Sequence, residues 1–346
     1  MNVKLKQILF PLFGKNFPFF TTGADVNRNT LCFSLASKGY PIVCIGTYQK
    51  RENLLLELKQ KNIAFEIIDD TLIKYDHHFI TCLTTSKENF FNLIQEKIQA
   101  CDIVFSINRE STKIISIAKE NGATTVALIT DAISERKKMY EINPDYILYN
   151  SESLANFGKQ FHSSSYHIFP PTFTPVKNEG IPKKLKNNIT LVNPIFDKGS
   201  DVFLALSKTL PSHHFLAVEG WKPIQIEPEY LDQNVRYFNK KHSRNMHLIY
   251  QETGILISPS RYNEGFGRTI IEAGLHGTPS IVSNKGALPE TIGEGGIVVN
   301  DYETSTWLNA IKKIEMNYEY YSRKAFENAQ QYLLDPEEEL KKIGIL

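Results

Sequence analysis

Short apolar runs alternate with longer amphipathic segments through the first half of the chain. Each short run is bounded by helix and strand breakers, which is typical of strands buried in a parallel sheet. These runs are Ile8–Phe13, Ile42–Gly46, Ala64–Ile68, Ile103–Ile107, Thr125–Ile129 and Tyr146–Tyr149. Between them, apolar residues recur at helical spacing over Thr30–Lys38, Lys50–Lys61, Lys87–Ala100 and Thr112–Asn121. The alternation of strands and helices predicts an α/β fold with a doubly wound parallel sheet.

Residues 170–188 interrupt this rhythm, because they are rich in proline and lysine, and they predict a linker. The alternation then restarts. We expect strands at Ile189–Val192, His214–Val218, Val235–Phe238, Gly254–Ser258, Ser280–Ser283 and Gly296–Val299, and helices at Asp201–Leu210, Gly267–His276 and Thr304–Met316. The final stretch, from Tyr318 to Leu346, reads as helical with a break at Pro336. Two consecutive doubly wound domains joined by a proline-rich hinge indicate an enzyme that binds its ligand between domains.

Composition narrows the class of protein without naming a partner. The chain has 346 residues, of which 42% are hydrophobic and 22% charged, and this favours two ordinary globular domains. A formal net charge of +1 does not indicate a nucleic-acid partner. The four cysteines lack metal-like or Cys-x-x-Cys spacing, so we expect reduced thiols in a cytoplasmic protein. No run reaches the roughly 18 apolar residues that span a bilayer, although peripheral contact with a membrane stays open. The sequence indicates no oligomeric state.

The most informative segment lies between two carboxylates, Glu264 and Glu272. A predicted strand, Gly254–Ser258, precedes it, and the glycine-rich turn between the two acids leads into a predicted helix. Backbone amides at a glycine turn and a helix start suit a phosphate, and carboxylates accept hydrogen bonds from sugar hydroxyls. From these residues alone, a nucleotide-sugar site and an ordinary surface turn both remain open.

The flanking residues carry a resemblance to a known family. The stretch from Ile257 to Gly274, which contains Pro-Ser, Glu-Gly-Phe-Gly and Glu-Ala, continues through Gly277-Thr278-Pro279 to Glu290. A second match runs from Leu191 to Asp201. Together these segments resemble the retaining glycosyltransferases of family 4, the "glycosyl transferases group 1" domain. The resemblance covers most of residues 189–300 and is only topological over residues 1–170.

The resemblance implies a GT-B fold, in which two Rossmann-like domains face each other across a cleft. By position, residues 1–172 would bind the acceptor, residues 173–330 the nucleotide sugar, and the helix of residues 331–346 would return to the first domain. Glu264 would contact the donor sugar, Glu272 the ribose, and Lys198 would neutralise the leaving diphosphate. The remaining donor-binding candidates are Gly265, Phe266, Gly267, Arg268, Thr269 and Asn193.

Three positions depart from the family pattern. Asn193 stands where many members have arginine, five residues before the lysine, so a phosphate contact would be weaker or come from Arg268 or Arg261. In the first domain, the predicted glycine loop around Gly23 has one glycine rather than two. The histidine that some members place in the cleft is absent, and Arg109 and Glu110 occupy that region. Gly23, Arg109 and Glu110 are therefore candidates for the acceptor side.

The sequence contains no Asp-x-Asp pair, so we expect neither a metal nor another cofactor. The resemblance implies a hexosyltransferase of polysaccharide biosynthesis that moves a sugar from a nucleotide-diphosphate donor, UDP-sugar by family frequency, to a hydroxyl of a glycan or lipid-linked acceptor. Two alternatives remain open. One is a nucleotide-sugar 2-epimerase of the same fold, and the other is a non-catalytic member that binds a sugar nucleotide or a partner. Donor sugar, acceptor and linkage do not follow from these residues.

Overall fold

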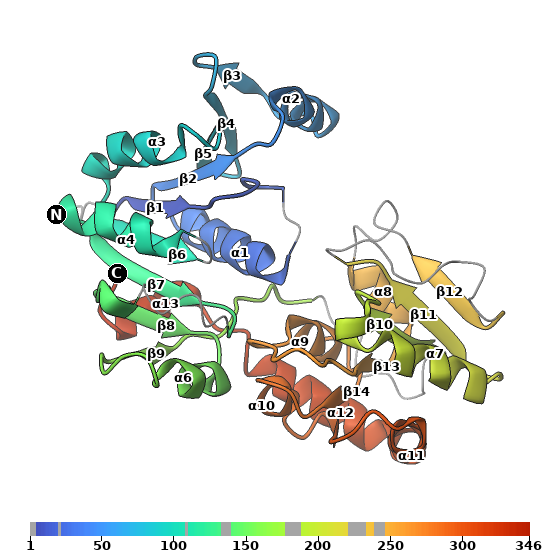
Figure 1. Cartoon of the computed structure of the whole chain (residues 1–346). Helices are drawn as coiled ribbons and strands as arrows, with labels where there is room; N and C mark the ends of the chain where they lie inside the picture. The colour runs from blue at the N-terminus through green and yellow to red at the C-terminus, as the bar shows by residue number, and fades with distance from the viewer. Residues whose placement is uncertain are drawn as a thin grey trace. The chain divides into compact units, whose positions relative to one another are not determined.

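The computed structural model describes residues 5–19, 22–107, 110–132, 140–176, 188–220, 233–238 and 246–346. The chain divides into two compact units (Figure 1). Unit 1 comprises Met1–Asn150, Leu154–Thr172 and Asp335–Leu346, and unit 2 comprises Ser151–Ser153 and Phe173–Leu334. Each unit is built on one sheet with helices on both faces, which confirms the predicted α/β fold.

Among the described residues, the unit 1 sheet has nine strands in the order β3-β4-β5-β2-β1-β6-β7-β8-β9. Their bounds are β1 Ile8–Pro11, β2 Ile42–Thr47, β3 Phe65–Ile67, β4 Ile73–His77, β5 Ile80–Thr85, β6 Ile103–Ile107, β7 Thr124–Ile129, β8 Tyr146–Tyr149 and β9 His167–Ile168. From β5 to β9 the neighbours pair in parallel. Because β2 lies on one side of β1 and β6 on the other, the strand order reverses at β1. Such a switch point is where doubly wound sheets bind ligands.

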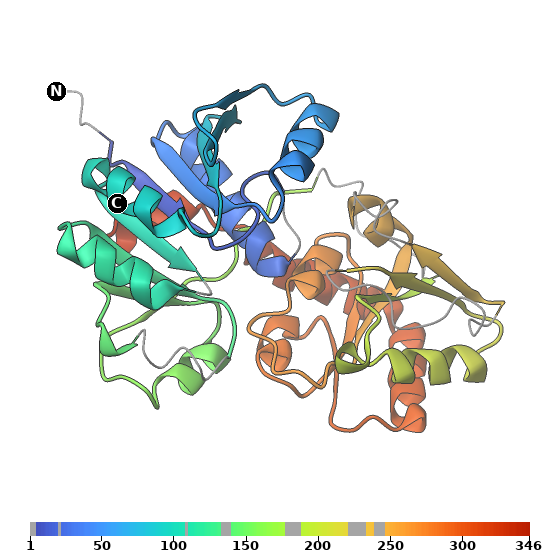
Figure 2. The same cartoon turned by 45° about the horizontal axis from the view of Figure 1, so that its top comes forward.

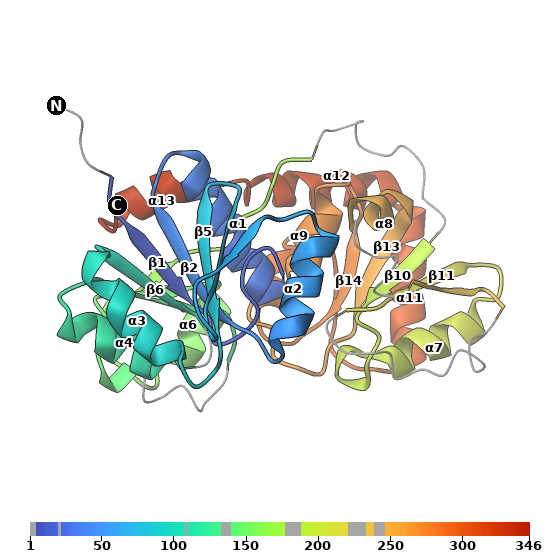
Figure 3. The ribbon, with the colours of Figure 1, turned by 90° about the horizontal axis from the view of Figure 1, so that it is seen from above.

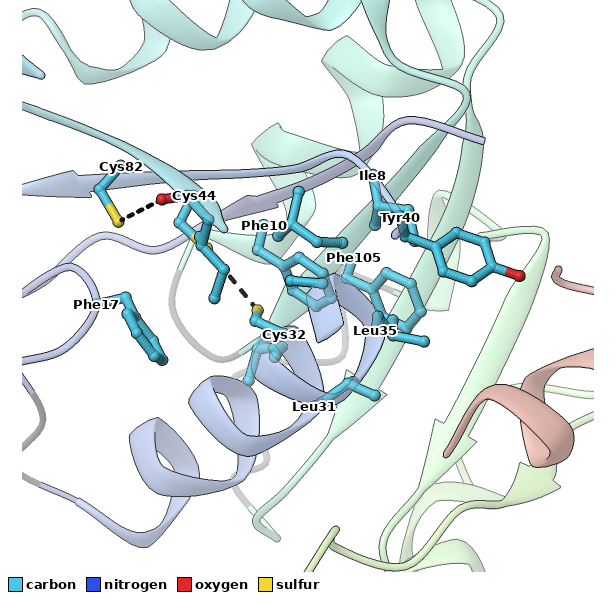
Figure 4. Close-up of a cluster of buried hydrophobic side chains, with 14 of the residues drawn as sticks. Ile8, Phe10, Phe17, Leu31, Cys32, Leu35, Tyr40, Cys44, Cys82 and Phe105 are labelled. Carbon is cyan, nitrogen blue, oxygen red and sulfur yellow. Dashed lines mark hydrogen bonds between the residues drawn. The ribbon is translucent and has the colours of Figure 1, made fainter. Parts of the chain in front are cut away.

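Helices cover both faces of this sheet. Their bounds are α1 Gly23–Ser37, α2 Arg51–Gln60, α3 Phe90–Lys97 with a 3-10 turn at Ile98–Ala100, α4 Ser111–Glu120 and α6 Glu152–Gly158. One core cluster joins α1 and α2 to one face, and a second joins α3 and α4 to the other. At the centre of the first cluster, the rings of Phe10 and Phe105 stack with centroids 4.7 Å apart (Figure 4).

Two expectations for unit 1 are wrong. We expected Ala64–Ile68 to be a buried parallel strand, but β3 is a mostly exposed edge strand that pairs antiparallel with β4. The β4–β5 hairpin beside it has no counterpart in the predicted elements, since its alternating polar residues do not read as a buried strand. We also expected a loop around Gly23, whereas α1 already begins there. Thr22 caps the helix through a capping box with Asp25.

Unit 2 contains a parallel sheet whose described strands follow the order β12-β11-β10-β13-β14-β15. The bounds are β10 Asn188–Val192, β11 His214–Val218, β12 Val235–Phe238, β13 Thr253–Ser258, β14 Ser280–Ser283 and β15 Gly296–Val299. All of these strands were predicted to within one residue. The order reverses at β10, between β11 and β13, so unit 2 has a switch point of its own.

The unit 2 helices are α7 Ser200–Thr209, α8 Met246–Glu252, α9 Arg268–Gly274, α10 Leu288–Ile292, α11 Thr304–Met316 and α12 Tyr318–Gln330. Helices α7 and α11 pack on one face of the sheet, around the fully buried Trp307. Figure 2 shows the ribbon of both units from a second direction. Helices α8, α9 and α10 contribute to the cluster on the other face. In the part of the chain that the structure describes, no helix has the length and apolar character needed to cross a bilayer.

The C-terminal segment belongs to unit 1. Helix α13, Pro336–Lys342, contacts α1 (Figure 3). Lys38 pairs with Asp335 and lies 2.9 Å from Glu337, and the Tyr40 hydroxyl donates to Glu337 over 3.0 Å. Leu340 is fully buried in the core of unit 1, so both charge pairing and apolar burial hold the segment.

The anchoring of α13 predicts a pH dependence of stability. The hydrogen bonds from Lys341 and then Lys38 lower the pKa of Glu337 from 4.5 to about 2. A lowered folded-state pKa stabilises the protein above the unfolded pKa, and this contribution is lost as pH falls from about 4.5 to about 2. Glu337→Gln should therefore reduce the free energy of unfolding at pH 7 by at most about 1 kcal/mol, because its lysine partners are solvated. Urea unfolding across this pH range checks the expectation.

The matched control for that comparison is Glu338→Gln, because Glu338 is exposed and has only a 3.6 Å ion pair with Lys341. The wild-type protein and Glu337→Gln should converge in stability toward pH 2. A stability difference that stays constant down to that pH contradicts the proposed role of the Glu337 charge.

Candidate active site

Two of the predicted site residues form an ion pair at the carboxyl edge of the unit 2 sheet. Lys198 ends a 3-10 turn, Phe196–Lys198, in the loop after β10, and Glu264 lies in the loop after β13. Strands β10 and β13 are parallel neighbours, so both loops leave the same edge of the sheet at its switch point. The Lys198 Nζ donates to Glu264 Oε1, and the two side chains are 20% and 14% exposed. The sequence identified both residues but not their contact.

Two glycines let these loops come together. Gly199 follows Lys198 with φ +80°, and a Cβ there would overlap the carbonyl oxygen of Pro259 just beyond β13. Gly286, with φ +56°, lies against the backbone of Glu264, and a Cβ there would overlap it as well. The Ala287 amide donates to the Glu264 carbonyl over 2.8 Å. The positive φ and the close approach both require glycine at these two positions.

Arg261 ties the two loops to each other. Its amide donates to the Asp197 carbonyl over 2.8 Å, and its Nη1 donates to the Phe196 carbonyl over 3.2 Å. The guanidinium binds the Asp201 carboxylate through two bonds of 2.8 and 2.7 Å. It also stacks between the rings of Phe196 and Tyr302, with its central carbon 4.5 and 4.3 Å from the two ring centres. Arg261 is therefore committed to positioning the loop that carries Lys198.

For the glycosyl transfer that the sequence resemblance implies, we expect Arg261→Lys to lower kcat about tenfold with little change in KM for the donor. A lysine keeps the charge but loses the bidentate fork and the ring stacking, and a small displacement of catalytic groups is costly. Steady-state kinetics with the nucleotide-sugar donor measure this split. Arg323→Lys is the matched control, because Arg323 forms only an exposed ion pair of 3.5 Å with Glu327. A change in thermal stability with unchanged kcat contradicts the positioning role.

Glu272 is held by two partners within unit 2. The Arg268 Nε donates to its Oε1 over 3.2 Å, one turn away on α9, and the Tyr250 hydroxyl donates to its Oε2 over 2.9 Å. Tyr250 is buried, and burial, followed by the negative charge of Glu272, raises its pKa well above the ordinary value. The hydroxyl thus stays protonated and orients the carboxylate. Tyr250 was not predicted, although the spacing of Met246, Ile249 and Tyr250 is that of a helix face.

Side chains from elsewhere in unit 2 form hydrogen bonds with the backbone of the turn before α9. The Gly265 carbonyl accepts from the Ser151 hydroxyl over 2.8 Å, and the Phe266 carbonyl accepts from the Thr291 hydroxyl. The Phe266 side chain is buried against Phe173 and Tyr332, so it supports the turn from inside. Gly267 has φ +90° and precedes the helix, and Thr269 lies half-buried in its first turn.

Asn193 directly follows strand β10 and has a left-handed conformation, with φ +62°. Its amide donates to the Val218 carbonyl at the end of β11, and its carbonyl accepts from Ile195. The side chain is 5% exposed, and neither its oxygen nor its nitrogen has a hydrogen-bond partner in the described structure. It packs against Gly220, where a Cβ would overlap it. Burying a side-chain amide without hydrogen bonds costs free energy, and a bound ligand that forms those hydrogen bonds would offset this cost.

Two of the three acceptor candidates of unit 1 lie in the described structure, at the starts of helices α1 and α4. Gly23 is the first residue of α1 rather than part of a glycine-rich loop. Glu110 is exposed and precedes α4 with φ +66°, and Arg109 lies outside the described residues. Arg268, suggested as a substitute for the missing arginine, pairs with Glu272 and lies over the Phe173 ring.

Comparison with solved structures shows what the whole chain resembles. The HepE protein of Anabaena in complex with UDP-glucose superposes with a TM-score of 0.74 and 13% identity, over 99% of this chain and 100% of that one. A sucrose-phosphate synthase from Thermosynechococcus elongatus gives 0.70 and 17%, over 98% of each chain. TarM gives 0.73 and 10%, over 99% of each. The fold is GT-B.

In sequence, residues 225–332 match the model of the family "Glycosyl transferases group 1". This interval includes Glu264 and Glu272. A D-inositol 3-phosphate glycosyltransferase of Corynebacterium kroppenstedtii is 33% identical over 24% of this chain. The O-antigen chain mannosyltransferase RfbU of Salmonella typhimurium is 24% identical over 56%. These two alignments span only 19% and 53% of the relatives' own lengths.

Proposed function

We propose that this protein is a retaining glycosyltransferase of family 4 that transfers a hexose from a nucleoside diphosphate donor to a hydroxyl group. The observation that carries the proposal is the Lys198–Glu264 ion pair at the switch point of the unit 2 sheet. It joins a cation suited to a diphosphate and a carboxylate suited to sugar hydroxyls at the edge where α/β sheets bind ligands. The matching family model supports it, as does the UDP-glucose bound to HepE.

The donor lies along unit 2 with its ribose at Glu272. That carboxylate is oriented by Arg268 and Tyr250 and accepts hydrogen bonds from the two ribose hydroxyls. The diphosphate lies near Lys198 and the Gly265–Thr269 turn, and the sugar lies at Glu264. UDP is the default nucleotide. The buried side-chain amide of Asn193 forms hydrogen bonds with an oxygen or a hydroxyl group of the bound nucleotide sugar. Because this amide is neutral, Lys198 carries more of the countercharge than it would beside an arginine.

In the chemical step, Lys198 exchanges its Glu264 partner for the donor diphosphate. The bond between the sugar C1 and the phosphate oxygen breaks, and the ring gains oxocarbenium character. Lys198 stabilises the charge that develops on the leaving diphosphate, and Glu264 holds the sugar hydroxyls that position C1. The acceptor oxygen attacks C1 from the same face, and its proton passes to the departing phosphate oxygen. The step needs no metal, since Lys198 supplies the countercharge.

The acceptor is a glycan or a lipid-linked sugar, and unit 1 binds it. The mannosyltransferase RfbU acts, by its name, on O-antigen chains, and a protein in the cps region of Klebsiella pneumoniae is 33% identical over 36% of this chain. These relatives favour a role in polysaccharide biosynthesis, at the cytoplasmic side of a membrane that would hold a lipid-linked acceptor.

Acceptor-dependent release of nucleotide tests the proposal. UDP-, GDP- and ADP-sugars are incubated with the protein, with and without a panel of free and lipid-linked glycans, and products are followed by NMR. A transferase releases nucleotide with one donor and only with an acceptor. Conversion of the sugar nucleotide without an acceptor would instead identify a 2-epimerase. Binding of a nucleotide in a thermal-shift assay, without turnover, would identify a non-catalytic member.

A further inference from the structure

Arg28 occupies a position on helix α1 that faces the core of unit 1, where an apolar residue would be expected. Arg28 lies on α1 three and seven residues before Leu31 and Leu35, which face the sheet and are 1% and 0% exposed. Figure 4 shows Leu31, Cys32 and Leu35 projecting from this helix into the core cluster. At helical spacing Arg28 continues the same face, and it is only 1% exposed.

The Arg28 guanidinium has no acidic partner in the described part of the chain. Among the described residues, no carboxylate forms an ion pair with it. Its Nε and Nη2 donate to Asn29 Oδ1 over 2.9 and 2.7 Å, and Nη2 reaches the Lys15 carbonyl only at 3.5 Å. Nη1 has no hydrogen-bond partner in the described structure. A buried cation without a countercharge destabilises a fold, so its presence needs an explanation.

The buried side-chain atoms of Asn27, Arg28 and Asn29 that have no hydrogen-bond partner in the described structure are all donors. The oxygen of Asn29 is occupied by Arg28, which leaves its Nδ2 without a partner in the described structure. Asn27, on the other side, is likewise 2% exposed: its oxygen accepts from the Thr172 amide over 3.1 Å, and its Nδ2 is unpaired. A water molecule would need acceptors as well as donors. A cation with unpaired N–H groups is instead complementary to an anion.

The position of Arg28 in the sheet also indicates a ligand. The Lys15 carbonyl that it approaches lies in the loop after β1, the strand at which the order of the unit 1 sheet reverses. The carboxyl end of such a strand is where doubly wound sheets bind ligands. The cation is therefore at the ligand-binding edge of unit 1, as Lys198 is in unit 2.

We propose that Arg28, together with Asn29, forms an anion subsite in unit 1 that binds a phosphate or carboxylate group of the acceptor. The assignment to an acceptor rests on the proposed function, whereas the anion site itself does not. Because Nη1 is enclosed, the groups packed around it must move to admit the anion. The apparent affinity is then reduced by the fraction of molecules in the open state, and the isolated group should bind in the millimolar range or weaker.

Anion-dependent thermal unfolding of the full chain tests this site without any donor. The starting protein, here called the parent, is the Lys198→Met variant, which lacks the proposed phosphate-binding lysine of unit 2. It is titrated with methyl phosphate and with glucuronate against sodium chloride at equal ionic strength. One of the two anions should raise the Tm of the parent beyond the chloride effect, and this identifies phosphate or carboxylate. Adding Arg28→Met to the parent should weaken the binding of that anion at least about tenfold.

Without anion, Arg28→Met should leave the Tm unchanged or raise it, because methionine keeps the buried aliphatic volume and removes an unpaired charge. Arg323→Met, in place of an exposed arginine, is the control and should leave the anion effect intact. An equal shift with and without Arg28, or no specific shift in the parent, overturns the proposal. If Arg28→Met does not fold, Arg28→Gln takes its place. Failure of both to fold shows that Arg28 is structural and also overturns it.

Discussion

Glu264→Gln should lower the turnover of the nucleotide-sugar donor by on the order of 10²-fold or more. Glutamine keeps the shape of the side chain but cannot accept with a charged oxygen from the donor-sugar hydroxyls. Under the proposed mechanism this contact strengthens as the sugar becomes an oxocarbenium ion, so kcat falls more than KM rises. The measurement is kcat and KM from nucleotide release with the donor and acceptor identified by the panel.

The control for Glu264→Gln is Glu294→Gln. Glu294 also pairs with a lysine of unit 2, Lys324, over 2.7 Å, but it does so on the surface. That variant should keep full activity. If Glu264→Gln turns over like the wild type while binding donor normally, Glu264 does not contact the reacting sugar and the site assignment fails.

Lys198→Met should reduce kcat by about 10²- to 10³-fold, a range typical for loss of one preorganised group that stabilises developing charge. The reason is that Lys198 is the proposed countercharge for the leaving diphosphate, and Asn193, which precedes it after β10, is neutral. Methionine preserves the length of the side chain without its charge. Lys324→Met, at the exposed ion pair with Glu294, is the matched control.

The double variant Lys198→Met/Glu264→Gln tests whether the two residues act as a unit. Because they touch in the structure and serve the same step, their effects on kcat should be far from additive. Full additivity would show that Lys198 and Glu264 act independently in the reaction, although they form an ion pair in the free protein. Urea unfolding of each variant separates this from a loss of folding, since each single change leaves a half-buried charge unpaired.

Most strands and helices could be predicted from the sequence, because a strand buried on both faces has to be apolar and a helix on a sheet has to be amphipathic. The exceptions are β4 and β5, the two-residue strand β9, the start of α1, and the short helices α6, α8 and α10. β4 alternates charged and apolar residues near a sheet edge and does not read as a buried strand. The start of α1 was missed because Asn27, Arg28 and Asn29 are polar, and polar residues predict a loop. Only the packing of the helix shows that all three are buried.

The sequence by itself determined that the chain has two α/β domains, because hydrophobic periodicity is a local property. Its resemblance to a known family then identified Glu264, Glu272 and Lys198 as candidate donor residues. The sequence did not determine which of these side chains meet. Lys198 and Glu264 are paired because β10 and β13 are neighbours in the sheet, and strand order depends on contacts between distant segments that no local pattern records. The same reason applies to Arg28, whose significance lies in burial without a countercharge.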